Sequence, residues 1–389
     1  MDNAPNPTPQ SAQATPAGPP QPHVAVAADP QEQAGRGGIG SRVPAKQRVI
    51  FSRQMSTLIN AGLPLVQGLS TVQNQTTNKT LKLITGDIIR DVEAGSSLAN
   101  SLAKYPKVFD KVYVSLVAAG EASGTLDKSM ERLAIQQEKD SEIVSRVRGA
   151  LMYPAIVLVV LFAVMIFMTV AVIPQVQNLY NSLPDAKLPL ITTILIDFSH
   201  AFTKLWWLVV LIVIGIVFGA RQWISKPAGR ETMDSLKMRV WPAGVLMMKL
   251  YMARFARTAS TLIGAGVPMI QALDTTADAV GNTHLSKAIN KAAEQVKGGK
   301  SLSASLTGDP NFLPLVPGMI NVGEESGALD EMLGRVADYY EKEVDNEIRT
   351  ISSVIEPVMM IAVGIIALII VAAVLLPIYS LAGKNFGNI

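Results

Sequence analysis

The sequence predicts an all-α membrane protein with two homologous cytoplasmic helical bundles and three transmembrane helices. Three observations lead to this fold class. Only 17% of the 389 residues are charged, against about 25% in an ordinary soluble domain. Three long segments carry no charge at all, and one long segment of the chain occurs twice.

The first expected unit is a disordered tail at 1–45. It contains nine prolines and many Ala, Gln and Gly residues, with almost no large apolar side chains. Such a segment buries too little surface to offset the entropy that is lost on ordering. It also lacks the apolar stretch of a signal peptide, so we expect the N-terminus to lie in the cytoplasm.

Three charge-free segments are expected to cross a membrane, because about 20 apolar residues span the hydrocarbon of a bilayer. The segments are 149–184, 205–220 and 357–383. The middle one is short, but Lys204 and Arg221 at its ends can extend their charged groups to the interface. A buried core helix is the alternative for each segment. The transmembrane helices are assigned to 149–174, 204–221 and 353–379.

Basic residues near these helices orient the chain, because cytoplasmic flanks are enriched in Lys and Arg. Nine basic residues precede the first span or follow the second: Arg132, Lys139, Arg146, Arg148, Arg221, Lys226, Arg230, Lys237 and Arg239. The only basic residues in the segment between these two spans are Lys187 and Lys204, and the only basic residue in the tail after the third span is Lys384. We therefore expect an external loop at 175–203 and an external tail at 380–389.

The internal repeat is clearest where FSRQMSTLINAGLPLVQGL at 51–69 aligns with FARTASTLIGAGVPMIQAL at 255–273, with eleven of nineteen positions identical. Apolar residues recur at three- and four-residue spacing in both copies, which predicts helices. The bundles are assigned to 46–148 and 222–352. The second transmembrane helix has no counterpart in the repeat. It returns the chain, so that both bundles face the cytoplasm.

Two kinds of turn are written in both copies. In AGLP and AGVP, Gly62 and Gly266 end one helix, and Pro64 and Pro268 start the next. The octapeptide GEASGTLD at 120–127 recurs as GEESGALD at 323–330, and Gly124 and Gly327 supply its flexible backbone. From this corner a long helix is expected to run into the first span, and its twin into the third. Two acid–base pairs at i,i+4 support these helices: Glu142–Arg146 and Asp345–Arg349.

Acidic residues at the corners are the candidate interaction site. Glu121, Glu324 and Glu325 are either solvated acids at helix ends or docking contacts on an exposed cytoplasmic tip. A third corner, GGKS at 298–301, lacks the earlier glycine of a phosphate-binding loop, so we interpret it as a turn capped by Ser301.

A second candidate site lies at the membrane boundary, where Pro154 and Pro357 fall inside the two long helices and Glu356 stands beside the second proline. A proline there bends a helix; the bend is either fixed or a means of transmitting motion. A carboxylate at membrane depth suggests a function, whereas at a boundary it is also compatible with a purely interfacial position.

The composition excludes several kinds of site. There is no cysteine, which rules out disulfides and thiolate sites. The net charge of +3 is small and dispersed, so no nucleic-acid partner is expected. The three histidines, His23, His200 and His284, lack the spacing of metal ligands. The sequence therefore predicts no catalytic residue, no cofactor and no metal.

The two copies of the 19-residue segment, the two octapeptides and the proline-bearing segments LMYPAIVLVV and VIEPVMMIAVG together resemble the type II secretion system F family. The resemblance covers residues 46–385. It implies a non-enzymatic platform protein in the inner membrane, at the base of a type IV pilus or type II secretion machine. The proline-rich start departs from the family pattern, so no function is carried onto it.

The resemblance also implies partners. They are a hexameric pilus-assembly ATPase, pilin or pseudopilin subunits, other inner-membrane assembly proteins, the lipid bilayer and a second copy of the chain, with a dimer favoured. It leaves pilus and secretion system undecided. Two alternatives from other classes stay open: a transporter or channel, since internal repeats and proline-interrupted spans occur there, and a membrane enzyme using the acidic corners.

Overall fold

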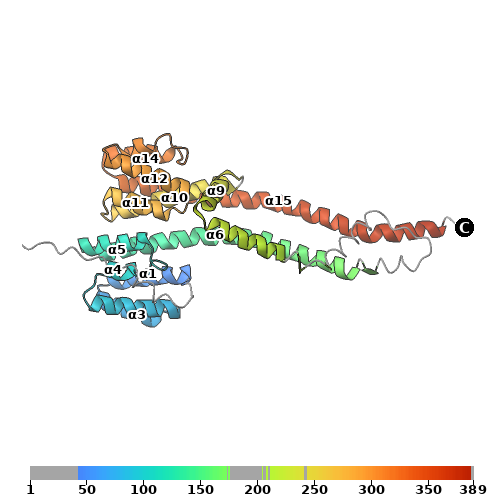
Figure 1. Ribbon diagram of the computed structural model, residues 1–389, viewed down its shortest axis with the longest axis horizontal. Coiled ribbons are helices and arrows are strands. Elements are labelled where there is room, and N and C mark those ends of the chain that lie inside the picture. The colour runs from blue at the N-terminus through green and yellow to red at the C-terminus, as the bar shows by residue number, and fades with distance from the viewer. Residues whose placement is uncertain are drawn as a thin grey trace, which may run out of the picture. The chain divides into compact units, whose positions relative to one another are not determined.

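A computed structural model describes residues 43–172, 174–175, 204, 207–208, 211–240 and 243–386. Every regular element in this part of the chain is a helix (Figure 1). The predicted all-α class is therefore confirmed for the described residues. The expected tail lies outside them apart from 43–45, and so does nearly all of the expected external loop at 175–203.

The first repeat consists of five short helices and the start of a long one. They are α1 (Ala45–Asn60), α2 (Leu65–Gln75), α3 (Lys79–Glu93), α4 (Leu98–Ala103), α5 (Lys111–Ser123) and α6 (Leu126–Phe167). The last of these ends in a wider π-helical turn, η2 (Met168–Val172).

The second repeat begins with a helix that has no counterpart among the described residues of the first repeat, and then follows the same order. Its helices are α9 (Pro227–Arg239), α10 (Ala243–Gly264), α11 (Met269–Ala279), α12 (Thr283–Lys297), α13 (Leu302–Leu306), α14 (Leu315–Ser326) and α15 (Leu329–Phe386). Both ends of α11 and of α12 lie 204 positions after those of α2 and α3, which is the offset of the sequence repeat. The duplication is thus one of structure as well as of sequence.

The additional helix α9 is fixed by one buried carboxylate. Proline occupies its first turn, where a missing N–H costs nothing. Asp234 on α9 accepts hydrogen bonds from the backbone N–H and the hydroxyl of Thr283, at 3.1 and 2.8 Å, and pairs with Lys237 at 3.0 Å. Since Thr283 begins α12, this carboxylate joins α9 to the body of the second repeat.

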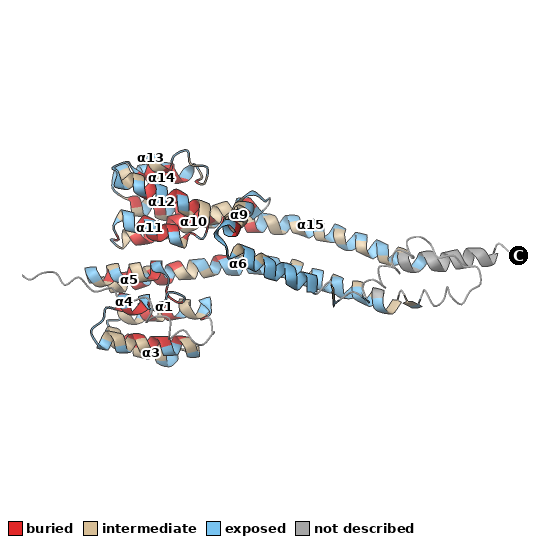
Figure 2. Cartoon of the chain, viewed as in Figure 1, coloured by how far each residue is buried: buried red, intermediate tan, exposed pale blue. Residues whose placement is uncertain are grey.

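Each repeat has its own buried core (Figure 2). Both cores contain the same aromatic pair. The ring centroids of Phe51 and Phe109 are 5.6 Å apart, and those of the corresponding Phe255 and Phe312 are 5.1 Å apart. The core of the first repeat is continuous with buried residues of the second, namely Leu262, Val267 and Ala272. The two repeats are therefore packed against each other.

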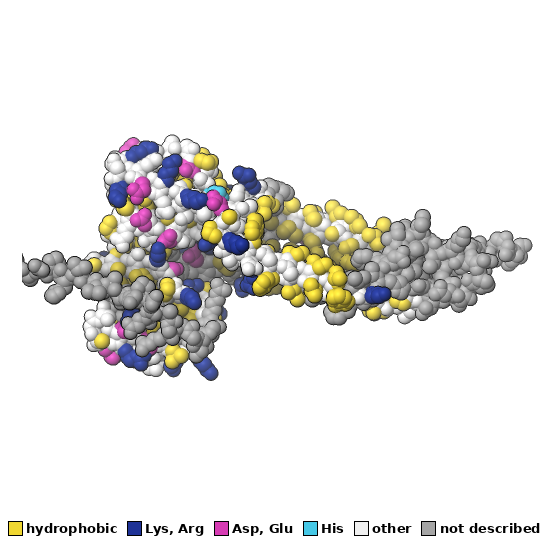
Figure 3. All heavy atoms as spheres, in the orientation of Figure 1, with side chains coloured by type: hydrophobic (Ala, Val, Ile, Leu, Met, Phe, Trp, Pro, Cys, Tyr) yellow, Lys and Arg dark blue, Asp and Glu magenta, His cyan; other side chains and the backbone are white. Residues whose placement is uncertain are grey.

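The two long helices change character along their length. Near its start α6 buries Met130 and Leu133 in the core, whereas beyond residue 150 most of its large apolar side chains are exposed, with Val159 at 69%. In α15, Leu333 is buried and Leu368 is 70% exposed. Figure 3 shows hydrophobic side chains along these segments. Soluble proteins rarely expose such continuous apolar surface.

Two helical segments, Leu126–Val172 and Leu329–Ala372, are long and apolar enough to cross a membrane, and none of the most apolar part of either is buried. They correspond to the expected first and third spans. The expected second span falls partly outside the described residues. Its continuously described part, from residue 211 on, belongs to a shorter apolar helix, Leu211–Ile224. The helix α15 continues to Phe386, beyond the expected end of its span at 379.

Candidate interaction site at the repeated corners

The repeated octapeptide, at 120–127 and 323–330, forms the corner between a short helix and a long one. In the first copy it joins α5 to α6, and in the second it joins α14 to α15. Gly124 and Gly327 end the short helices with φ of 70° in both copies, in the left-handed region. Glycine adopts this conformation without strain, which explains why both copies keep it.

The first glycine of the octapeptide allows the two helices to approach closely. A Cβ on Gly120 would lie 2.6 Å from the hydroxyl of Ser129, and one on Gly323 would lie 2.9 Å from the Cα of Leu329. Real Cβ atoms essentially never make contacts shorter than 3.0 Å. Gly120 and Gly323 are therefore required by the packing of the corner and not by backbone conformation.

The glutamate that follows each of these glycines caps another helix. Glu121 accepts hydrogen bonds from the backbone N–H groups of Leu98 and Ala99, at 2.6 and 2.9 Å. These groups belong to the first turn of α4, where N–H groups have no partner within the helix. The negative charge also interacts favourably with the positive end of the helix dipole.

Glu324 makes the same contacts at the start of α13. It accepts from the N–H groups of Leu302 and Ser303, at 2.6 and 3.1 Å, and from the hydroxyl of Ser303. Two of the three predicted docking residues, Glu121 and Glu324, are thus half-buried and already bonded within their own repeat. As expected, the hydroxyl of Ser301 accepts from Ala304 N and caps the same helix.

Glu325 differs from these two glutamates because its side chain is exposed. It accepts one hydrogen bond, at 2.7 Å, from Asn321 on the preceding turn of the same helix. The corresponding residue of the first copy is Ala122, which is also exposed. Of the three predicted docking residues, Glu325 is therefore the one whose side chain is exposed.

The AGLP and AGVP turns are built alike in the two copies. Gly62 and Gly266 have φ of 81° and 85°, two positions after the ends of α1 and α10. Pro64 and Pro268 are the residues immediately before α2 and α11, so each precedes the first turn of the next helix by one position.

An arginine–glutamate pair in each repeat joins α1 to α6 and α10 to α15. Arg53 donates to Glu138 at 2.6 Å through Nε, and the corresponding Arg257 donates to Glu341 at 2.8 Å. The hydrogen bond from Arg53 lowers the pKa of the Glu138 carboxyl, although desolvation opposes the change. The sequence alignment contains both arginines, but their partners could be found only from the structure.

A polar cleft of about 640 Å³ lies between the repeats. At its edge Lys111 pairs with Asp278, and inside it Gln136 donates to Thr258 at 3.1 Å. Desolvation raises the pKa of the Asp140 carboxyl, although this side chain still reaches water at the mouth of the cleft. The Oε1 atom of Gln136 is buried, with no hydrogen-bond partner in the described part of the chain.

Just before the exposed apolar segments, the two long helices are joined by an ion pair between Arg146 and Asp345. The predicted Glu142–Arg146 pair is present at 3.5 Å. The predicted Asp345–Arg349 pair is absent from the ion pairs of the described residues. Asp345 instead binds an arginine of the other repeat, because α6 and α15 lie in contact.

The three predicted boundary residues lie within the long helices. Pro154 is inside α6, and Glu356 and Pro357 are inside α15, where both are exposed. No hydrogen bond or ion pair of Glu356 occurs among the described contacts, and the helices continue beyond both prolines. That the two prolines bend the long helices stays a prediction.

A family model described as "Type II secretion system (T2SS), protein F" matches residues 51–174 and again residues 255–377. The chain belongs to this family. The two matches begin in α1 and α10 and reach into the apolar segments after α6 and within α15. Each copy of the family unit is therefore one helical bundle together with the apolar helix that continues it.

Similar proteins belong to two kinds of machine. The chain is 37% identical over 350 residues to the "Type IV pilus assembly protein PilC" of Thermus thermophilus, covering 88% of this chain and 86% of the relative. It is 35% identical over 346 residues to the protein of that name from Pseudomonas aeruginosa, covering 88% and 92%. It is also 35% identical over 355 residues to the "Type II secretion system protein F" of P. aeruginosa, covering 90% and 87%.

Proposed function

We propose that the chain is the inner-membrane platform protein of a type IV pilus or type II secretion machine. On this proposal it is not an enzyme, and it couples a cytoplasmic hexameric ATPase to the insertion of pilin or pseudopilin subunits into a filament. The observation that carries the proposal is the family match to both repeats, each a helical bundle continued by an apolar helix. Family membership also favours this reading over a transporter or channel.

The experiment that tests this role is deletion of the gene. Surface filaments, or secreted substrates in a secretion machine, should be lost while pilin is still made and inserted in the membrane. A plasmid-borne copy of the whole chain should restore them. Normal filaments and normal secretion in the deletion strain would refute the proposal.

The proposed topology places both bundles in the cytoplasm and the C-terminus outside. The charge-free segments 149–184 and 357–383 include the exposed apolar parts of α6 and α15. Five basic residues follow the expected second span within 19 positions (221 to 239), as cytoplasmic flanks do. With two parallel copies of bundle and span, a third crossing near 204–221 is needed to bring the second bundle back.

The proposed contact with the ATPase lies at the α14–α15 corner and centres on Glu325. Because Glu121 and Glu324 are occupied as helix caps, changing them would disturb the fold as well as any contact. Glu325→Lys reverses an exposed charge without touching the cap. It should weaken co-purification of the ATPase, whereas Ala122→Lys at the matching position of the first repeat serves as control. Unchanged co-purification with Glu325→Lys would leave this corner a purely structural feature.

Self-association is supported by the way in which the repeats pack. Helices α5 and α6 contact α11 and α10 of the second repeat. The reverse pairing, of α14 and α15 with α2 and α1, makes no comparable contact in the described part of the chain. In this head-to-tail arrangement the α1–α2 face of the first repeat and the α14–α15 face of the second repeat are left without a partner repeat. Two chains can pair these faces, which favours a dimer of four repeats.

Exposed apolar side chains lie on both of these faces. Ile50 on α1 corresponds to Arg254 in the packed interface, and Tyr339 on α15 corresponds to Gln136; they are 39% and 49% exposed. If the faces pair between chains, Tyr339→Glu should lower the mass of the detergent-purified protein to that of a monomer. A mass unchanged by Tyr339→Glu together with Ile50→Glu would refute this mode of association.

A further inference from the structure

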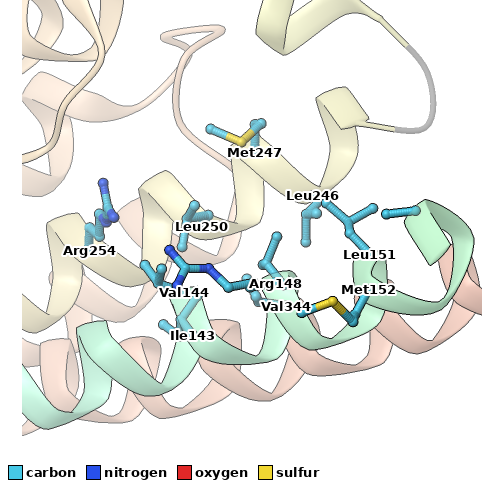
Figure 4. A pocket seen from close by; sticks show the side chains of 12 residues that line it. Ile143, Val144, Arg148, Leu151, Met152, Leu246, Met247, Leu250, Arg254 and Val344 are labelled. Carbon is cyan, nitrogen blue, oxygen red and sulfur yellow. The ribbon is translucent and has the colours of Figure 1, made fainter. Parts of the chain in front are cut away.

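A second cavity, of about 520 Å³, lies where the long helices leave the bundles. We refer to it as the boundary groove. Its walls come from three helices (Figure 4): residues 143–155 of α6, residues 246–254 of α10, and Val344 of α15. The volume falls in the range of about 300–1,000 Å³ that is typical of small-molecule sites.

The boundary groove is apolar along most of its length and cationic at one end. Leu151, Met152 and Leu246 lie at one end, and Arg254 lies at the other, beyond Leu250 (Figure 4). Arg148 lies between Val144 and Leu250, toward the Arg254 end. The groove therefore has the polarity of an amphiphile, with a long apolar part and a positive charge near one end.

The two arginines differ from the other cations nearby. Arg146 is bound to Glu142 and Asp345, and Lys249 to Glu343 and Glu347 at 2.9 and 2.8 Å. No hydrogen bond or ion pair of Arg148 occurs among the described contacts, and its side chain is exposed. The charge of Arg254 acts on Asp140 in the neighbouring cleft, without an ion pair among the described residues.

The groove also lies where the first charge-free segment of the sequence begins. Residue 149, next to Arg148, begins the first charge-free segment, and Leu151 and Met152 are each 53% exposed within it. If the proposed topology holds, the arginine end faces the cytoplasm and the apolar end lies among acyl chains. Anionic lipids of the cytoplasmic leaflet attract basic residues at this height.

We propose that the boundary groove binds one anionic phospholipid of the cytoplasmic leaflet. An acyl chain lies along Leu151, Met152 and Leu246, and the phosphate pairs with Arg148, with Arg254 adding positive potential behind it. The proposal rests on the membrane topology given above. A bound lipid would fill the space between α6 and α10 and so couple the two repeats at the point where they meet the membrane.

The test uses the whole chain, purified in a neutral detergent, with dioleoylphosphatidylglycerol and dioleoylphosphatidylcholine as probes in native mass spectrometry. The wild-type chain should retain phosphatidylglycerol in preference to phosphatidylcholine. Arg148→Gln should lower that preference by about fivefold, which is the factor that one basic residue near an anionic surface contributes. The control Arg335→Gln removes the same charge from an exposed position paired with Glu331 and should leave the preference unchanged.

Two further arms identify the occupant. Leu246→Trp fills the groove and should reduce retention of the bound lipid, with Ala155→Leu as a milder filler if the tryptophan prevents folding. Glycerol 3-phosphate, which has the charge but no acyl chain, should not displace the lipid. The proposal is overturned if Arg148→Gln keeps the wild-type preference, if glycerol 3-phosphate competes as well as the lipid, or if filling the groove changes only the oligomeric mass.

These outcomes are independent of the platform role. Lipid retention is measured on the purified chain, whereas the platform role is measured by filaments or secretion in the deletion strain. Loss of the lipid preference in Arg148→Gln with filaments intact would support the groove and leave the platform role standing. Failure of the proposed topology would instead appear in reporter fusions.

Discussion

Replacing Glu324 by alanine tests the structural reason for the repeated octapeptide. Its carboxylate accepts hydrogen bonds from the N–H groups of Leu302 and Ser303 and from the hydroxyl of Ser303. Hydrogen bonds to charged groups contribute about 1.5–3 kcal/mol each. Water can replace part of this because the side chain is only half-buried, and Ser301 still caps the helix. We expect the free energy of unfolding to fall by about 2 kcal/mol, the upper end for the loss of a cap.

The assay is thermal unfolding of the whole chain in detergent. In folded domains of roughly 150–250 residues, each 1 kcal/mol of lost stability lowers the unfolding temperature by about 2–4 °C, so the expected drop is about 4–8 °C. Glu325→Ala is the matched control. It removes an exposed side chain bonded only within its own helix, so its effect should stay within about 0.5 kcal/mol.

The reasoning would be refuted if Glu324→Ala and Glu325→Ala unfolded at the same temperature as the wild type. The capping bonds would then contribute nothing. The presence of a glutamate at this position in both copies would need another cause, such as a contact with a partner protein.

Three further substitutions test other parts of the fold. Gly327→Ala places a side chain at φ of 70° and should lower the free energy of unfolding by about 1–2 kcal/mol. The control Gly318→Ala, in the helix that Gly327 ends and with open space around it, should cause no such loss. Equal losses in the two variants would contradict this prediction. Arg257→Met should destabilise the chain by about 2 kcal/mol, more than Arg53→Met, because its pair with Glu341 is less exposed; the reverse order of unfolding temperatures would contradict the account. Asp140→Asn should raise the unfolding temperature at pH 7, because the raised pKa means that folding opposes ionisation of this carboxyl. The gain should vanish as the pH falls through the raised pKa toward the ordinary value of 3.8, and a gain independent of pH would refute the assignment.

Local patterns in the sequence were enough to predict the helical class, the duplication and the turns. Positive φ at Gly62, Gly124, Gly266 and Gly327 follows from glycine at the end of an apolar periodic segment. These features depend on neighbours within a few positions, so they can be read without a structure.

The functions of the acidic residues could not be predicted in the same way, because their partners are distant in sequence. The backbone groups that Glu121 binds lie 22 and 23 positions earlier. Asp345 had a suitable partner at i+4, but contact between α6 and α15 places Arg146 nearer. The cleft around Asp140 and the boundary groove likewise exist only because the two repeats pack together, which the sequence of each repeat alone does not specify.

The central claim is that a helical module with its own membrane helix was copied, and that an additional crossing keeps both copies in the cytoplasm. Reporters fused near residue 290 test it most directly, one active only in the cytoplasm and one only outside, with fusions near residue 190 for comparison. The account predicts cytoplasmic signal at 290 and external signal at 190. External signal at 290 would contradict the topology and the platform role together.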